Sequence, residues 1–254
     1  MINQLKILYH LTLSPVRGAT HQQRLDSFYG GQADGYDDFR KRMLHGRDQM
    51  FAELPITTGG SWVDLGAGTG ENATRFGERL GEFGDVRLVD LSESLLAIAD
   101  RRVRDAGWSN VRTLHADVTK LDNPVYDLPD ESVDLVTFTY SLTMIPDWFS
   151  ALAQAQRILK PGGTLGIVDF YVARKWPAAG RAKHSFFTRS FWPVWFSMDN
   201  VHPSADHLPF LTSRFEPVSI DEHFGKLPWL PIIRAPYYRF VGRKPAPRSS
   251  GSES

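Results

Sequence analysis

Between residues 61 and 169, short apolar runs alternate along the chain with longer segments of mixed character. A short apolar run bounded by turn residues is typical of a buried strand. In the longer segments apolar residues recur at spacings of three and four, as at Leu95, Ala99 and Val103, which predicts helices packed by one face. The predicted strands are 61–65, 86–89, 111–115, 133–139 and 164–169, and the predicted helices are 71–80, 93–106 and 148–159.

The order of these elements predicts the fold class. Strands separated by helices of this length imply crossover connections, and such connections join parallel strands. We therefore expect an α/β fold, a doubly wound, mostly parallel sheet with helices on both faces. Ser92 and Asp147 stand where they can cap the second and third helices.

Outside this region the pattern is weaker. Residues 1–55 favour helices and are predicted to form a helical N-terminal extension. Residues 56–244 are predicted to form the main domain, with an insertion at 170–211 that is rich in aromatic residues and proline. Further strands are expected at 215–220 and 237–241, and residues 245–254, rich in Pro and Ser, predict a disordered tail.

Composition and charge exclude several classes of protein. The 29 Lys and Arg residues balance the 29 Asp and Glu residues, so no global basic field is present and we expect no nucleic-acid partner. Because the chain has no cysteine, it has no disulfide, thiolate metal site or cysteine nucleophile. No apolar run approaches the roughly 18 residues that a membrane-spanning helix requires. We expect a cytoplasmic protein.

A glycine-rich loop follows the first predicted strand. Gly66, Gly68 and Gly70 lie between that strand and the next helix. Glycine lets the backbone turn sharply and approach a ligand, and helix N–H groups point into the crevice at the carboxyl end of the strand. An ordinary strand-to-helix turn is the alternative.

The end of the second strand favours a nucleotide ligand. Asp90 lies 20 residues after Gly70, which is the spacing expected of a carboxylate that binds both ribose hydroxyls. The alternative role, capping the next helix, already belongs to Ser92. Glu71 replaces the last glycine of a dinucleotide fingerprint and would repel a pyrophosphate. The same carboxylate is tolerable beside a ligand that carries an ammonium and a sulfonium.

Four motifs in this order resemble the class I S-adenosylmethionine-dependent methyltransferases. They are 64–70, Asp90, 115–118 and 159–163. The resemblance implies a Rossmann-like sheet with a late antiparallel strand, S-adenosylmethionine as cofactor and S-adenosylhomocysteine as product. It also implies that Asp90 binds the ribose, Asp117 the adenine amino group, and that Tyr140 faces the methyl group. The residues expected at the cofactor are Tyr36, Asp64, Gly66, Ala67, Gly68, Asp90, Leu91, Asp117, Val118 and Tyr140.

The flanking segments carry a narrower resemblance, to the N-methyltransferases of bacterial betaine-lipid synthesis. These segments are 27–36, 46–48, 195–202, 206–209 and 235–238. The resemblance implies trimethylation of the homoserine amine of diacylglyceryl-homoserine. Two other functions stay open: methylation of a small molecule such as a natural product or a quinone, and binding of S-adenosylmethionine without turnover. The cofactor motifs do not separate them, because binding and turnover share these motifs.

The narrower resemblance also leads to substrate residues. A homoserine carboxylate needs a cationic partner, so Arg40 or Arg47 is expected to hold it. Trp195 is a candidate substrate contact, with a core or lid role as the alternative. Tyr29 and Tyr140 are candidate catalytic residues that assist loss of a proton from the amine, with packing on the cofactor as the alternative. No metal site is predicted, since the spacing of Asp199, His202, Asp206 and His207 matches no helix face.

A lipid substrate would place the protein at the inner face of the membrane, with the lipid headgroup as its partner. Residues 2–14 are mainly apolar around Lys6 and His10, which predicts a short helix lying in the membrane interface. A lid over the active site is the alternative for the same segment. The sequence predicts neither the oligomeric state nor the acyl-chain preference.

Overall fold

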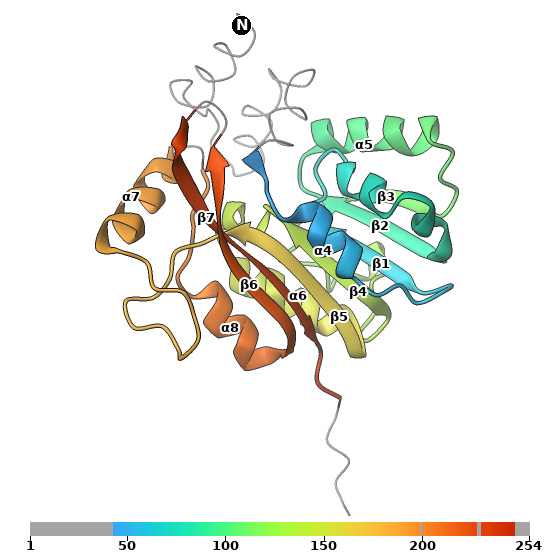
Figure 1. Cartoon of the computed structure of the whole chain (residues 1–254). Coiled ribbons are helices and arrows are strands. Elements are labelled where there is room, and N and C mark those ends of the chain that lie inside the picture. The colour runs from blue at the N-terminus through green and yellow to red at the C-terminus, as the bar shows by residue number, and fades with distance from the viewer. Residues whose placement is uncertain (1–42, 199, 228–229, 247–254) are drawn as a thin grey trace, which may run out of the picture.

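Seven strands form one sheet in the order β3-β2-β1-β4-β5-β7-β6 (Figure 1). The computed structural model describes residues 43–198, 200–227 and 230–246, and the statements below concern these residues. The strands are β1 (Ser61–Leu65), β2 (Asp85–Asp90), β3 (Val111–His115), β4 (Val133–Thr139), β5 (Leu159–Phe170), β6 (Glu216–Leu227) and β7 (Leu230–Arg243). The first five pair in parallel, whereas β7 is antiparallel to both β5 and β6. The expected fold, mostly parallel with a late antiparallel strand, is confirmed.

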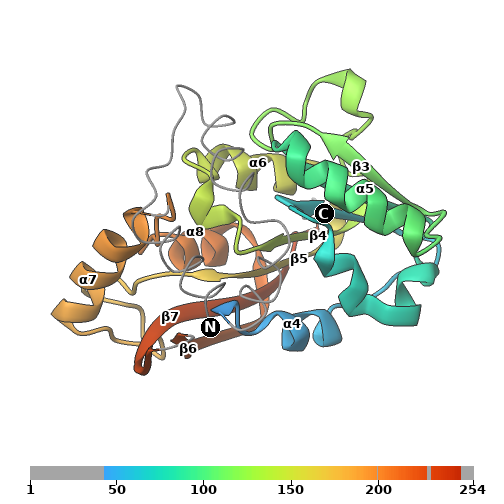
Figure 2. The ribbon, with the colours of Figure 1, turned by 90° about the horizontal axis from the view of Figure 1, so that it is seen from above.

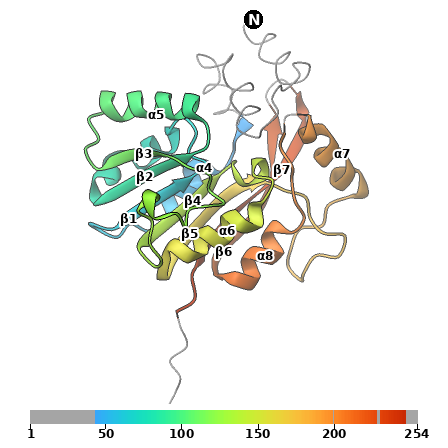
Figure 3. The same ribbon diagram turned by 180° about the vertical axis from the view of Figure 1, so that it is seen from behind.

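Helices cover both faces of this sheet. Helix α4 lies in front of the sheet in Figure 1, and α6 and α8 lie in front of it when the molecule is seen from behind in Figure 3. Figure 2, the view from above, shows the sheet between α4 and α8. The helices are α4 (Arg47–Glu53), α5 (Glu93–Asp105), α6 (Trp148–Ile158), α7 (Phe186–Ser197) and α8 (His207–Arg214), with 3₁₀ segments η1 (Glu71–Glu82), η2 (Pro124–Tyr126) and η3 (Leu142–Met144).

The two faces of the sheet form two separate apolar cores. In β1, Trp62 belongs to the core that contains α4, while Val63 and Leu65 belong to the core that contains α6 and α8. Successive strand residues point to opposite faces, so a strand that is buried on both sides, such as β1, supplies both cores at once. This arrangement fixes the carboxyl ends of β1, β2 and β4 along one edge of the sheet.

The ends of the helices follow the expected capping residues. The Ser92 hydroxyl accepts a hydrogen bond from the Leu95 N–H at 3.4 Å, and an Asp147 oxygen accepts one from the Ser150 N–H at 3.2 Å. The helix expected at 71–80 instead forms a 3₁₀ segment, and Gly77 interrupts it with φ 57° and ψ −132°. Glycine adopts such a backbone without a Cβ penalty, so the apolar spacing there predicted the buried face but not the type of helix.

The late hairpin is longer than the sequence predicts. Strands β6 and β7 extend well beyond 215–220 and 237–241. Most of β6 is exposed or half-buried because it lies at the edge of the sheet, so it carries no continuous apolar run. Pro236 lies opposite Phe224 within the ladder, although proline usually interrupts a strand.

Within the described residues no helix has the length and apolar character needed to cross a bilayer.

Candidate functional site

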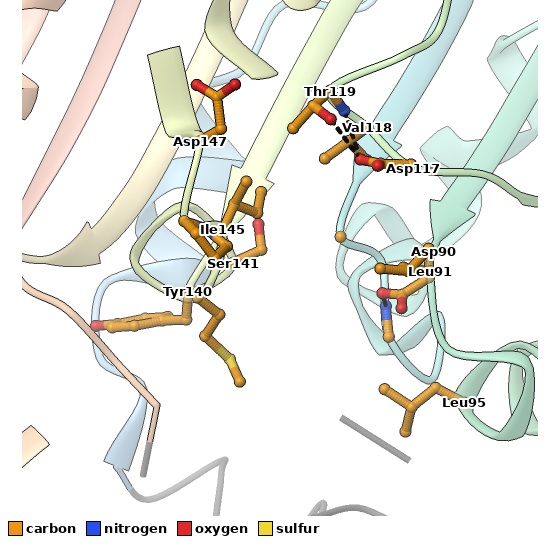
Figure 4. Close-up of a pocket in the computed structure, with 14 residues that line it drawn as sticks. Asp90, Leu91, Leu95, Asp117, Val118, Thr119, Tyr140, Ser141, Ile145 and Asp147 are labelled. Atoms are coloured by element: carbon orange, nitrogen blue, oxygen red, sulfur yellow. Dashed lines mark hydrogen bonds between the residues drawn. The ribbon is translucent and has the colours of Figure 1, made fainter. Parts of the chain in front are cut away.

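A cavity of about 250 Å³ opens at the carboxyl ends of β1, β2 and β4 (Figure 4). In an open α/β sheet this edge is the place where ligands bind, because loops diverge there in opposite directions. The cavity is lined by Gly66, Gly68, Asp90, Leu91, Leu95, Asp117, Val118, Thr119, Tyr140, Ser141, Met144, Ile145, Pro146 and Asp147.

The glycine loop forms the floor of this cavity. Gly66 has φ +74°, and a Cβ there would lie 2.4 Å from the Cβ of Ser141. Both the conformation and the space therefore require glycine. The N–H groups of Gly66 and Ala67 donate to the carbonyl of Val89, each at 2.9 Å, which ties the loop to the end of β2.

Asp90 joins the loops on two sides of the cavity. One carboxylate oxygen accepts from the Gly68 N–H at 2.7 Å, and the other accepts from the Ser92 N–H at 2.9 Å. Its exposed fraction is 8%, yet it lies on the cavity wall. Each oxygen of a carboxylate has a second lone pair, so the side chain can still accept from ligand hydroxyls. This geometry suits the ribose role that the sequence predicts.

Asp117 presents an ionised carboxylate to the same cavity. One of its oxygens accepts from the N–H of Thr119 at 3.0 Å and from its hydroxyl at 2.7 Å (Figure 4). Partial burial acts to raise the pKa of Asp117, but these hydrogen bonds and the Lys120 ammonium hold the pKa below its ordinary value. A charged acceptor of this kind can bind an exocyclic amino group.

Asp64 lies behind the glycine loop and not on the cavity wall. It is fully buried, and it accepts from Asn72 at 2.9 Å and from the Thr137 hydroxyl at 2.7 Å. Burial raises the pKa of Asp64 to about 6, against these two hydrogen bonds. Ala67 is also buried and is absent from the lining. Both residues hold the loop in place from below.

Tyr140 combines a strained backbone with a buried hydroxyl. Its φ of 52° is unusual for a residue with a side chain, and such strain is found at functional sites. The hydroxyl donates to the carbonyl of His45 at 2.7 Å. Burial, with Asp169 nearby, raises the pKa of Tyr140 well above its ordinary value. A hydroxyl that stays protonated and already donates to a carbonyl is a poor proton acceptor, so this environment argues against Tyr140 as a base.

The structure separates the predicted substrate residues from the cavity. Arg47 is buried in an ion pair with Glu71, at 2.7 Å, and is not on the cavity wall. Trp195, on α7, is half-buried and is likewise absent from the lining. Tyr29, Tyr36, Arg40 and the segment 2–14 lie outside the described residues, and so do Asp199 and the tail from 247. In the described part of the chain no three side chains of metal-ligating type gather in one place.

The loop after β4 is the main part of the site that sequence reasoning missed. Ser141, Met144, Ile145, Pro146 and Asp147 from this loop line the cavity, and Asp147 also caps α6. Leu95 and Thr119 were missed too. The available signal was topological: a loop that follows a central parallel strand must lie at the ligand-binding edge.

Comparison with known proteins agrees with this geometry. A sequence model of the ubiE/COQ5 methyltransferase family matches residues 39–219. A demethylmenaquinone methyltransferase of Bacillus velezensis is 28% identical over 117 residues, 46% of this chain and 48% of the relative. A ubiquinone/menaquinone biosynthesis C-methyltransferase of Psychromonas ingrahamii is 28% identical over 176 residues, 67% of this chain and 68% of that protein. The match thus spans about half the length of the first relative.

A solved structure shows the same architecture. The phospholethanolamine N-methyltransferase 2 of Haemonchus contortus, in complex with phosphomonomethylethanolamine and S-adenosylhomocysteine, superposes with a TM-score of 0.65. The superposition covers 90% of this chain and 61% of that chain, at 18% identity. At this identity the likeness concerns the fold, which is that of the class I S-adenosylmethionine-dependent methyltransferases. Since the family model matches more than half of the sequence, the chain belongs to the ubiE/COQ5 methyltransferase family.

These comparisons correct the narrower expectation from the sequence. Trimethylation of the homoserine amine of diacylglyceryl-homoserine is wrong as the main function. The relatives in the matched family are named as a demethylmenaquinone methyltransferase and a ubiquinone/menaquinone biosynthesis C-methyltransferase. The cofactor expectation, S-adenosylmethionine, is confirmed by the family. The narrower resemblance relied on flanking segments, one of which lies outside the described residues. Arg47, one of the two candidate carboxylate partners, already pairs with Glu71, and Arg40, the other, lies outside the described residues.

Proposed function

We propose that this chain transfers the methyl group of S-adenosylmethionine to a ring carbon of a quinol. The observation that carries the proposal is the family match together with relatives named as quinone C-methyltransferases. The cavity offers a matching donor site, with a glycine cradle, the Asp90 carboxylate and the Asp117 acceptor. These groups suit an adenosine that carries a cationic methionine end.

The residues of the chain have separate tasks in this proposal. Asp90 binds the ribose hydroxyls, and Asp117 accepts from the adenine amino group. The backbone at Gly66 and Gly68 lets the methionine end approach without a Cβ in the way. The loop after β4 contributes Met144, Ile145 and Pro146, an apolar wall that excludes water from the acceptor.

The reaction forms a carbon–carbon bond while the bond between sulfur and methyl breaks. The bound cofactor supplies an electrophilic methyl group on a sulfonium. The electron pair comes from a ring carbon made electron-rich by the hydroxyls of the quinol, and the sulfur leaves as a neutral thioether. The ring proton then passes to solvent or to a basic group. Alignment within near-attack distance accounts for most of the rate gain, so positioning residues suffice.

The test is an acceptor assay with S-adenosylmethionine labelled in the methyl group. A reduced prenylated naphthoquinone that lacks the ring methyl should gain one methyl on carbon, identified by mass spectrometry. The oxidised quinone should react far more slowly, because its ring carbon is electron-poor. A lipid amine of equal chain length serves as the control acceptor. Methylation of the amine alone would refute the proposal, and cofactor binding with no product from any acceptor would favour a binding module.

A further inference from the structure

Helix α7 carries apolar side chains on two opposite faces. Trp192 and Phe196, four residues apart, are both 4% exposed and pack on the rest of the protein. Phe187, Val194 and Met198 follow spacings of seven and four, which place them together on the opposite side. Their exposed fractions are 69%, 70% and 53%. A helix that only covers a core needs one apolar face, so packing within the described chain does not account for the second.

The segment around this helix is strongly basic. Residues 174–198 contain no Asp or Glu, although basic and acidic residues are equal in number over the whole chain. Lys175 and Lys183 are exposed in the loop before α7, and Trp176 in the same loop is 81% exposed. Arg174 and Arg181 have acidic partners, because they pair with Asp206 at 2.7 Å and with Glu222 at 3.9 Å. The basic residues of the segment are Arg174, Lys175, Arg181, Lys183 and Arg189.

A series of aromatic rings joins the buried face of α7 to the cofactor cavity. Phe196 stacks on Phe170 with 4.5 Å between ring centroids. Phe170 in turn makes an edge contact with Tyr140 at 4.7 Å, and Tyr140 lines the cavity. The buried face of α7 is therefore connected to the wall of the donor site through Phe170, and the exposed face lies on the other side of the same helix. Figure 1 shows α7 at the margin of the molecule opposite α5.

We propose that Phe187, Val194 and Met198, here named the α7 surface, dock on a lipid bilayer that contains anionic lipids. Exposed aromatic and aliphatic side chains enter the interface between headgroups and acyl chains, and neighbouring lysines contact anionic headgroups. Charge argues against a second copy as the partner, because a symmetric contact brings the same basic residues face to face. The docking proposal does not depend on which acceptor is methylated. Only the idea that docking brings the protein to a membrane-bound quinol rests on the proposed function.

Vesicle flotation of the full chain tests this surface. The probe is a vesicle of phosphatidylcholine with about one third phosphatidylglycerol, compared with phosphatidylcholine alone. The test variant is Phe187→Ser with Val194→Ser, and the matched control is Phe149→Ser with Val125→Ser, which removes one exposed Phe and one exposed Val elsewhere. Circular dichroism melting verifies that each variant is folded.

The charge contribution has its own pair of variants. Lys175→Gln with Lys183→Gln removes two exposed cations beside α7, and Arg101→Gln with Arg104→Gln removes two exposed cations from α5. We expect the α7 variant to bind anionic vesicles about tenfold or more weakly than the parent chain, since two apolar side chains no longer enter the interface. The lysine variant should lose binding only to anionic vesicles, and both controls should float like the parent.

Three results would overturn the proposal. The first is a parent chain that does not float, or an α7 variant that floats equally well. The second is loss of flotation only when residues 2–14 are deleted, which would assign the contact to that segment. The third is a parent that sediments as a dimer while the α7 variant is monomeric and binds vesicles unchanged, which would make the surface a contact between copies. Each result is read without measuring methyl transfer, so failure of docking and failure of the proposed function are distinguishable.

Discussion

At the scale of single residues, the donor site depends on a few backbone contacts that tolerate no substitution. Asp90 accepts from two backbone N–H groups on opposite loops, and Gly66 occupies a space that a methyl group would fill. Such residues shape the cavity before any ligand enters it. The cost of replacing them should therefore appear in cofactor affinity as well as in stability.

Asp90→Asn should weaken binding of S-adenosylmethionine by about 1–3 kcal/mol, because charge-assisted hydrogen bonds are lost. Titration calorimetry measures the affinity. Asp85→Asn is the matched control, since Asp85 lies at the other end of β2 and pairs with Arg87 and Arg112. A folded Asp90 variant with unchanged affinity would remove this residue from the site.

Gly66→Ala should abolish detectable cofactor binding, because the new methyl group would displace Ser141 or reshape the loop. Gly107→Ala is the control, since Gly107 also has positive φ, +67°, but no atom lies within 4 Å of its added Cβ. Gly107→Ala should lower the free energy of unfolding by about 1 kcal/mol, the backbone penalty alone, and leave the affinity for S-adenosylmethionine unchanged. Equal loss of affinity in both variants would mean that stability alone is responsible.

At the scale of elements, buried ion pairs hold α4 against the start of η1. Arg47 binds Glu71 at 2.7 Å, and Glu71 also binds Arg75 at 2.9 Å, with all three side chains nearly buried. The carboxylate at the start of η1 thus has two cationic partners. This network explains why a glutamate is accepted where a dinucleotide-binding protein has glycine.

Arg47→Met should lower the free energy of unfolding by about 1–3 kcal/mol, because Glu71 loses one of its two buried partners. Chemical denaturation measures this loss, and turnover should fall alike for all acceptors. The double variant Arg47→Met with Glu71→Gln should recover part of the stability. A substrate-selective loss in the single variant, with unchanged stability, would instead indicate contact with the acceptor.

The sequence predicted the elements best where pattern and burial agree. Strands β1 and β4 are buried along most of their length, so their content of Val, Leu, Trp and Phe marked them accurately, although Asp64 and Asp134 interrupt the apolar runs. Asp90 was found because it ends a strand at the ligand-binding edge, and Asp117 through the resemblance of the motif 115–118 to the class I methyltransferases. The length of the β6–β7 hairpin was underestimated because an edge strand carries polar residues and tolerates proline. Arg47 was misplaced because no local pattern reveals that Glu71, 24 residues away, would bind it.

At the scale of the whole molecule, a buried histidine outside the lining of the donor cavity makes stability depend on pH. His207, at the start of α8, is fully buried and packs edge-on against Trp148. Burial lowers the pKa of His207 to about 3. The native protein therefore keeps this imidazole neutral at pH values where an unfolded chain would protonate it, and stability becomes dependent on pH.

The contribution of His207 to the free energy of unfolding should fall as the pH decreases from about 6.5 towards 3, since only the unfolded state binds this proton in that range. Asp64 and Asp169 act in the opposite direction, because burial raises their pKa values to about 6 and about 7. The contribution of His207 is about 2 kcal/mol between pH 6.5 and 5. Urea denaturation across this range measures it, with His207→Gln as the comparison. The stability of the parent relative to the variant should decrease over the same interval as the pH falls. Parallel curves for parent and variant would show that His207 does not carry the effect.

The position of β7 has a consequence for the order in which the chain acquires its structure. β7 lies between β5 and β6, although it is made after both of them. During translation the outer edge of β5 consequently has no partner until residues 230–243 have left the ribosome. An unpaired strand edge is a template for association with other chains. The growing polypeptide therefore passes through a stage in which chaperone protection matters most, shortly before the last strand inserts and closes the sheet.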